Sequence, residues 1–164
     1  MKMARVFGLA AAIAMMASFT VRAADLSEQI EKYFELVSNG KDDEAKKLGD
    51  TILASADKDS NCLNDFAWKI LTDEGIKKRD LDLGMKAAKA AYDLCEGKEA
   101  PIVDTYARAF FETGKIDEAI KFQKKAVELC QDENLKGELE EALKKYEKKA
   151  AEKKTDDKKP EEKK

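Results

Sequence analysis

The sequence predicts an all-α protein built as a short array of about three helix hairpins followed by a closing helix. Apolar residues recur with the 3.6-residue period of an amphipathic helix, and no segment shows the alternation of a β-strand. The two prolines, Pro101 and Pro160, lie outside the expected helix interiors. One hairpin cannot bury its apolar stripe alone, so neighbouring hairpins must stack against it.

The N-terminal segment, residues 1–23, has the organisation of a secretory signal peptide. A positively charged start precedes an uncharged run of 16 residues, Val6 to Val21, and small residues follow at the expected cleavage point. The run is shorter than the roughly 20 residues of a spanning helix, and an uncleaved membrane anchor is the alternative. We therefore expect an exported bacterial protein, periplasmic or secreted, with no membrane association after cleavage.

The charge balance argues against a nucleic-acid partner. The chain carries 31 basic and 34 acidic residues, a formal net charge of −3. The signal segment holds three of the basic residues and no acid, so the mature chain has 28 basic against 34 acidic residues and a net charge of −6. The two signs are interleaved, as on solvated helix faces.

Residues 24–150 suit a single domain, and its clearest hairpin is residues 100–130. Two amphipathic stretches flank a turn at Gly114. The second stretch matches one that lies 35 residues earlier, so residues 61–95 form a similar hairpin. Small Gly84 matches small Ala119 there, as expected where two helices cross closely.

The first helices of these two hairpins align at an offset of 40, because Ala67 matches Ala107. Five extra residues must therefore lie in the loop of the earlier hairpin, from Thr72 to Asp80. The composition of this loop is typical of a surface turn.

A less regular hairpin precedes these two, over residues 26–56. Asn39 and Gly40 predict a helix end with the glycine in a left-handed conformation, and Gly49 interrupts the helix that follows.

The last predicted helix covers residues 134–150 and closes the exposed end of the array. Its apolar stripe consists of Leu135, Leu139, Ala142, Leu143 and Tyr146. Residues 151–164 are rich in Lys and acidic residues, so we expect this tail to be disordered.

These hairpins resemble tetratricopeptide repeats. The turn Gly114-Lys115-Ile116-Asp117-Glu118-Ala119-Ile120 is similar to the Gly-x-Tyr-Asp-Glu-Ala-Ile core of that family. Ala107 and Ala126 occupy the small positions of the two helices, whereas Gln123 stands where the family usually has an aromatic residue. Leu63-Asn64 with Ala67-Trp68, followed by Asp104-Thr105-Tyr106-Ala107-Arg108-Ala109, also resembles helical-repeat regions appended to exported bacterial thioredoxin-like proteins.

The resemblance implies a right-handed superhelical array that binds a protein or peptide in a concave groove lined by the first helix of each hairpin. Carried over by position, the groove residues are Phe34, Asn64, Trp68, Leu71, Asp104, Arg108 and Phe111. This lining is mostly apolar, so the implied ligand is a partner helix or an apolar peptide segment. Ordinary core packing is the alternative for each apolar position.

The mature chain keeps three cysteines. Cys62 begins the first helix of the middle hairpin and Cys95 ends the second, and antiparallel packing brings such ends together. A disulfide needs a Cα separation of about 4.4–6.8 Å and persists in an oxidising compartment. Cys62 and Cys95 are therefore disulfide candidates, with two reduced, buried thiols as the alternative. Cys130 is either buried or paired between chains.

Catalysis finds no support in the sequence. The chain has no histidine, and its cysteines lack the paired spacing of a zinc site. We therefore expect no enzymatic activity, no metal and no cofactor. The expected function is a protein–protein interaction module. A redox-linked accessory protein and a self-associating component of the cell envelope, possible as a homo-oligomer, are the alternatives.

Overall fold

The computed structural model describes residues 25–56 and 58–156, and within these ranges every regular element is a helix. The predicted all-α class is thereby confirmed. The chain divides into two compact units, Met1–Ser55 and Ala56–Lys164, where the sequence predicted one domain. The signal segment, residues 1–23, lies outside the described residues, and so does the end of the tail from residue 157 onward.

The first unit contains a helix over residues 25–38 and α2 (Asp42–Ser55). Gly40 joins them with a φ of 71°, so the left-handed glycine predicted here is confirmed. The N–H of Lys41 donates to the carbonyl of Leu36 at 2.9 Å, and this bond closes the last turn of the helix. Gly49 is buried on α2, and the helix runs through it without a break, so the interruption predicted there is wrong.

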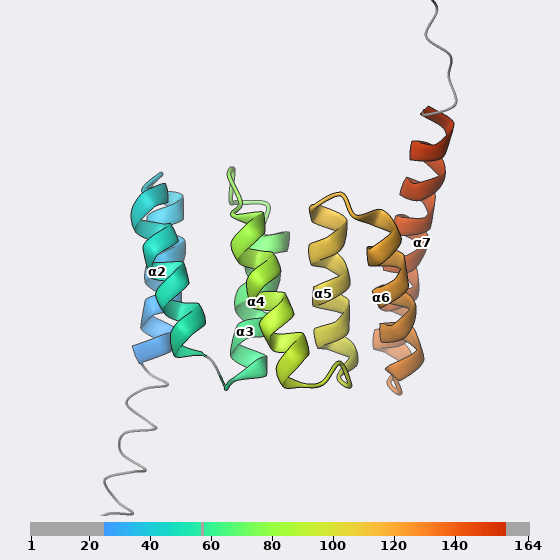
Figure 1. Cartoon of the computed structure of the whole chain (residues 1–164), viewed down its shortest axis with the longest axis horizontal. Helices are drawn as coiled ribbons and strands as arrows, with labels where there is room; N and C mark the ends of the chain where they lie inside the picture. The colour runs from blue at the N-terminus through green and yellow to red at the C-terminus, as the bar shows by residue number, and fades with distance from the viewer. Residues whose placement is uncertain (1–24, 57, 157–164) are drawn as a thin grey trace, which may run out of the picture. The chain divides into compact units, whose positions relative to one another are not determined.

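The second unit contains the remaining helices in two hairpins and a final helix. They are α3 (Ser60–Thr72), α4 (Leu81–Leu94), α5 (Ala100–Glu112), α6 (Ile116–Leu129) and α7 (Glu133–Asp156). Each helix packs against the next, and α3 also packs against α5. In the view of Figure 1, α4 lies in front of α3, and α6 lies in front of α7.

Aspartate side chains begin three of these helices. Asp59 accepts from the N–H of Cys62, and Asp80 accepts from the N–H of Leu83, both at 2.9 Å. Asp132 accepts from two N–H groups at the start of α7. Each carboxylate satisfies donors that have no partner within the helix and lies at its positive end.

Small residues allow close packing between the helices of the second unit. A Cβ added at Gly84 would lie 3.0 Å from the side chain of Leu71, so α4 approaches α3 closely at this point. Ala67, Ala107 and Ala119 are all 0% exposed. The small residues matched between the hairpins therefore lie in the packed interior, as the sequence predicted.

The final helix is longer than the predicted 134–150, because α7 continues to Asp156. Residues 151–156 are consequently helical rather than part of a disordered tail. Alanine, lysine and glutamate favour helix without any buried stripe. Lys149 pairs with Glu152 at 3.4 Å, and Lys153 and Lys154 lie in the last turn, where the helix dipole favours positive charge.

Candidate interaction surface

The seven residues predicted to line a groove lie in different environments. Phe34 belongs to the first unit, is 8% exposed and packs edge to face on Tyr33 with ring centroids 5.0 Å apart. The other six belong to α3 and α5 of the second unit. Phe34 is therefore a buried packing residue in this structure, which is the alternative that its apolar character left open.

On α3, Trp68 is exposed and Leu71 is not. Trp68 is 41% exposed, whereas Leu71 is 0% exposed and lies under Gly84 of α4. Leu71 follows Ala67 by four residues and therefore shares the stripe that packs on α4. Asn64 is half-buried one turn before Trp68, and its amide nitrogen donates to Asp65 at 3.3 Å.

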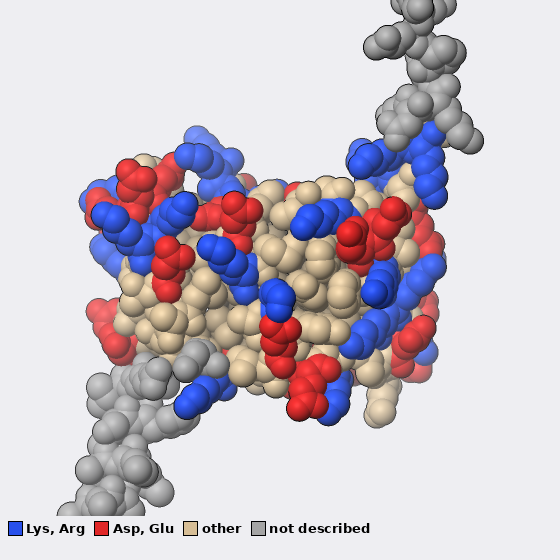
Figure 2. All heavy atoms as spheres, in the orientation of Figure 1, with Lys and Arg blue, Asp and Glu red and all other residues tan. Residues whose placement is uncertain are grey.

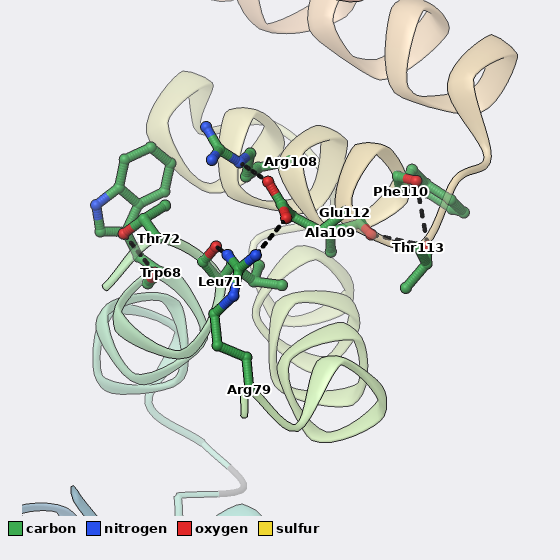
Figure 3. Close-up of polar contacts among 9 residues, drawn as sticks. All are labelled: Trp68, Leu71, Thr72, Arg79, Arg108, Ala109, Phe110, Glu112 and Thr113. Atoms are coloured by element: carbon green, nitrogen blue, oxygen red, sulfur yellow. Dashed lines mark hydrogen bonds and ion pairs between the residues drawn. The ribbon is translucent and has the colours of Figure 1, made fainter. Parts of the chain in front are cut away.

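An ion-pair network joins the α3–α4 loop to α5, as Figure 3 shows. Arg79 donates from Nη2 to Glu112 at 2.9 Å, and Arg108 donates from Nε to the other carboxylate oxygen at 2.8 Å. Arg79 also donates from Nη1 to the carbonyl of Leu71 at the end of α3. The Glu112 side chain is only 13% exposed, so its two charge-assisted bonds are poorly screened by solvent.

A second polar cluster lies where α5, α6 and α7 meet. Gln123 is 0% exposed and donates from Nε2 to Asp104 at 2.7 Å and to the carbonyl of Leu139 at 3.1 Å. Burial raises the pKa of Asp104, while the Gln123 hydrogen bond and the positive charge of Arg108 act in the opposite direction. Asp104 is thus occupied by an internal partner.

Phe111 is partly covered by the final helix. Its ring stacks on Tyr146 of α7 with centroids 4.3 Å apart, and Lys145 Nζ lies 5.4 Å from the Phe111 centroid. Tyr146 is 1% exposed, and burial is the main cause that raises the pKa of its hydroxyl. Phe111 therefore holds α7 against α5 and offers only part of its surface to a partner.

Of the predicted residues, Trp68 is the one that this arrangement leaves exposed, and Arg108 is half-buried. In Figure 3 the indole of Trp68 and the terminal nitrogens of Arg108 lie on the same side of the α3–α5 pair. Arg108 keeps 23% of its side chain exposed while its Nε is held by Glu112. Trp68 offers a large aromatic surface and Arg108 offers a hydrogen-bond donor, and both residue types are enriched in protein-binding hot spots.

The three cysteines are free thiols, so the predicted bond between Cys62 and Cys95 is not formed in this structure. Burial, and then the negative charges of Asp59 and Asp65, raise the pKa of the Cys62 thiol. This disfavours the reactive thiolate. Cys130 is 8% exposed, and its Sγ donates to the carbonyl of Asp132 at 3.3 Å.

Sequence reasoning missed the network around Glu112. Arg108 and Glu112 are four residues apart on one helix, a spacing that suggests an ion pair. Nothing local indicates Arg79, because it comes from a loop read only as a surface turn and meets a residue 33 positions away.

Among the described residues, no cluster of three or more His, Cys, Asp or Glu side chains is arranged to hold a metal ion. Within the same residues, no helix is both long enough and apolar enough to span a membrane. Comparison of the chain with protein-family models, with curated proteins and with solved structures found no match.

Proposed function

We propose that this chain is an exported protein–protein interaction module of the tetratricopeptide kind. Its surface on α3 and α5, centred on Trp68, would receive a partner helix or an apolar peptide segment. The observation that carries the proposal is the 41% exposure of Trp68 on α3. Exposing a large aromatic side chain serves no packing purpose, and a partner that covers it would gain both apolar burial and a hydrogen bond.

The fold supports this proposal through the rigidity of the surface. Arg79 ties the end of α3 to Glu112, and Glu112 in turn holds Arg108. A side chain already held in place loses less conformational entropy when a partner binds. The repeat-like sequence pattern and the successive helix hairpins support the superhelical arrangement that we propose for the array.

The proposal is tested by comparing Trp68→Ala with Leu94→Ala. Leu94 is 42% exposed and lies at the end of α4, so it is a control of matched exposure outside the proposed surface. After crosslinking in the native compartment, Trp68→Ala should lose the captured partner while Leu94→Ala retains it. Equal capture by both variants would show that the surface around Trp68 does not bind the partner.

The chain has a single tryptophan, so a second readout is direct. Adding the captured partner to the purified chain should shift the Trp68 emission to shorter wavelength, because its indole leaves water. An unchanged spectrum in the presence of saturating partner would place the binding site elsewhere.

The redox alternative is less well supported, because the environment of Cys62 disfavours its thiolate and Cys130 is buried. Self-association is distinguished by light scattering of the purified chain, which should report a monomer if the surface serves a different protein. Intact-mass analysis of the exported product tests cleavage near residue 23.

A further inference from the structure

Four aromatic rings form a contiguous cluster across α4, α5 and α6, away from Trp68. Tyr92 comes from α4, Tyr106 and Phe110 from α5, and Phe122 from α6. Tyr106 lies 4.9 Å from Tyr92, 4.7 Å from Phe110 and 4.8 Å from Phe122 between ring centroids. Phe110 and Phe122 stack with their ring planes 5° apart. We call these four residues the aromatic cluster.

The aromatic cluster reaches the surface. Tyr106 is 8% exposed, and the other three rings are half-buried. In Figure 2, drawn from the side on which α4 and α6 lie in front, an area without charged atoms extends over α4, α5 and α6. Atoms of basic and of acidic residues stand at its edges.

Three lysines hold their ammonium groups near these rings. Lys115 Nζ lies 5.8 Å from the Phe110 centroid, and Lys121 Nζ lies 5.7 Å from that of Phe122. Lys125 Nζ lies 4.8 Å from the Tyr92 centroid and donates to its hydroxyl at 2.8 Å. Each contact is a cation–π interaction at the surface.

None of these three lysines forms an ion pair with a carboxylate of the described chain. Neighbouring Lys124, by contrast, pairs with Glu147 at 3.2 Å, and Lys89 on the edge of the cluster pairs with Asp93 at 2.5 Å. The chain as a whole is acidic, with a formal net charge of −3. Lys115, Lys121 and Lys125 therefore leave positive charge beside one apolar surface.

We propose that the aromatic cluster and its three lysines form a second docking surface, which binds an acidic peptide segment carrying apolar side chains. The apolar side chains would cover the exposed ring edges, and the carboxylates would pair with Lys115 and Lys121. The surface would match such a peptide in charge as well as in polarity. The three lysines have no carboxylate partner among the described residues, and their contacts with the rings hold them close to the apolar surface.

A nucleic acid fits these observations less well. Phosphate backbones bind to extended basic surfaces, whereas this surface carries three unpaired lysines in an acidic chain. The expected ligand is therefore an acidic peptide, and an oligonucleotide is the competing ligand in the test.

The experiment is an NMR titration of the exported chain. The probe is a short, acetylated and amidated peptide of Glu, Leu and Phe. The first control peptide replaces each Glu with Lys, and a single-stranded oligonucleotide is the second. The acidic peptide should shift the resonances of Phe110, Phe122 and Lys121 and leave the Trp68 indole unchanged. Neither control should cause these shifts, and added salt should weaken the effect.

Charge variants locate the interaction. Lys115→Gln combined with Lys121→Gln should weaken binding of the acidic peptide roughly tenfold, since two charge contacts are lost. Lys46→Gln combined with Lys47→Gln removes the same charge from exposed positions of α2 and should leave binding unchanged. Circular dichroism checks that both variants fold.

Four results would overturn the proposal: no saturable binding of the acidic peptide, shifts centred on Trp68, equal weakening by both charge variants, or tighter binding of the oligonucleotide at the aromatic cluster. A negative result at the aromatic cluster would not bear on the function proposed for the surface around Trp68, because the two tests use different residues and different ligands.

Discussion

Replacing Gln123 with leucine should destabilise the second unit, although leucine is the more apolar side chain. Gln123 is 0% exposed and donates to Asp104 on α5 and to the Leu139 carbonyl on α7. In Gln123→Leu both acceptors lose their donor. The residue therefore joins three helices through bonds that an apolar side chain cannot replace.

The magnitude follows from these contacts. Losing the bond to the Asp104 carboxylate costs about 1.5–3 kcal/mol. The Leu139 carbonyl lies inside α7 and keeps its helical hydrogen bond, so losing the second bond costs about 0.5–1.5 kcal/mol. Gln123 Oε1 is itself buried without a partner, so removing it raises the free energy of unfolding by about 1–2 kcal/mol and offsets part of these losses. We expect Gln123→Leu to lower the free energy of unfolding by about 2 kcal/mol.

The effect should depend on pH. Burial raises the pKa of Asp104, and the Gln123 hydrogen bond opposes this shift, so the substitution raises that pKa further. A carboxyl group with a raised native pKa contributes stability that is complete below its unfolded pKa and is lost as the pH rises through its native pKa. The deficit of Gln123→Leu should therefore shrink as the pH falls through the raised native pKa towards about 4, and change no further below that pH.

Urea unfolding followed by circular dichroism measures both quantities. Gln131→Leu, at an exposed position, is the matched control and should change the stability by less than about 0.5 kcal/mol. The reasoning is refuted if Gln123→Leu is as stable as the parent chain at neutral pH, or if its deficit grows on acidification.

Four further predictions concern other parts of the second unit. Gly97→Ala should lower the free energy of unfolding by about 2 kcal/mol, because Gly97 has a φ of 61° and an added Cβ would lie 2.5 Å from the Tyr92 ring. Gly137 lies in α7 with nothing near an added Cβ, so Gly137→Ala should raise the free energy of unfolding by about 0.5–1 kcal/mol. Urea titration measures both glycine variants, and the same change in stability for Gly97→Ala and Gly137→Ala would contradict the packing described. Glu112→Gln should lower the free energy of unfolding by about 2 kcal/mol, because two guanidinium groups lose their carboxylate partner. It should also speed amide hydrogen exchange in the loop that carries Arg79. Unchanged exchange would show that the network does not hold the loop. Cys62 should react with a thiol reagent more slowly than a free cysteine at pH 7, because its pKa is raised, and a reaction as fast as that of free cysteine would revive the redox alternative.

The helices and their ends were predictable because their signals are local. A stripe of period 3.6, a turn glycine and a capping aspartate each act within a few residues. Gly40 and Gly114 adopt the positive φ that such turns need, at 71° and 79°. The end of α7 was harder to predict, since residues 151–156 continue the helix through backbone propensity without an apolar stripe.

The site was less predictable because it depends on contacts between helices. A stripe on α3 indicates that Leu71 and Trp68 are apolar positions, yet only the position of α4 decides that Leu71 is covered and Trp68 is not. Gln123 was recognised as unusual for its position, but its role requires the carbonyl of Leu139 on α7. Arg79 meets Glu112 across 33 residues, a distance that no local pattern spans.

Site-specific photocrosslinking tests the central claim most directly. A benzoylphenylalanine residue in place of Trp68 preserves a large aromatic group at the proposed surface, and the same residue in place of Leu94 probes an equally exposed position on α4. Illumination in the native compartment should join the first variant to one protein partner, through a helical or apolar segment of that partner, and leave the second free. Crosslinks of the same partner from both positions, or from position 94 alone, would contradict the account.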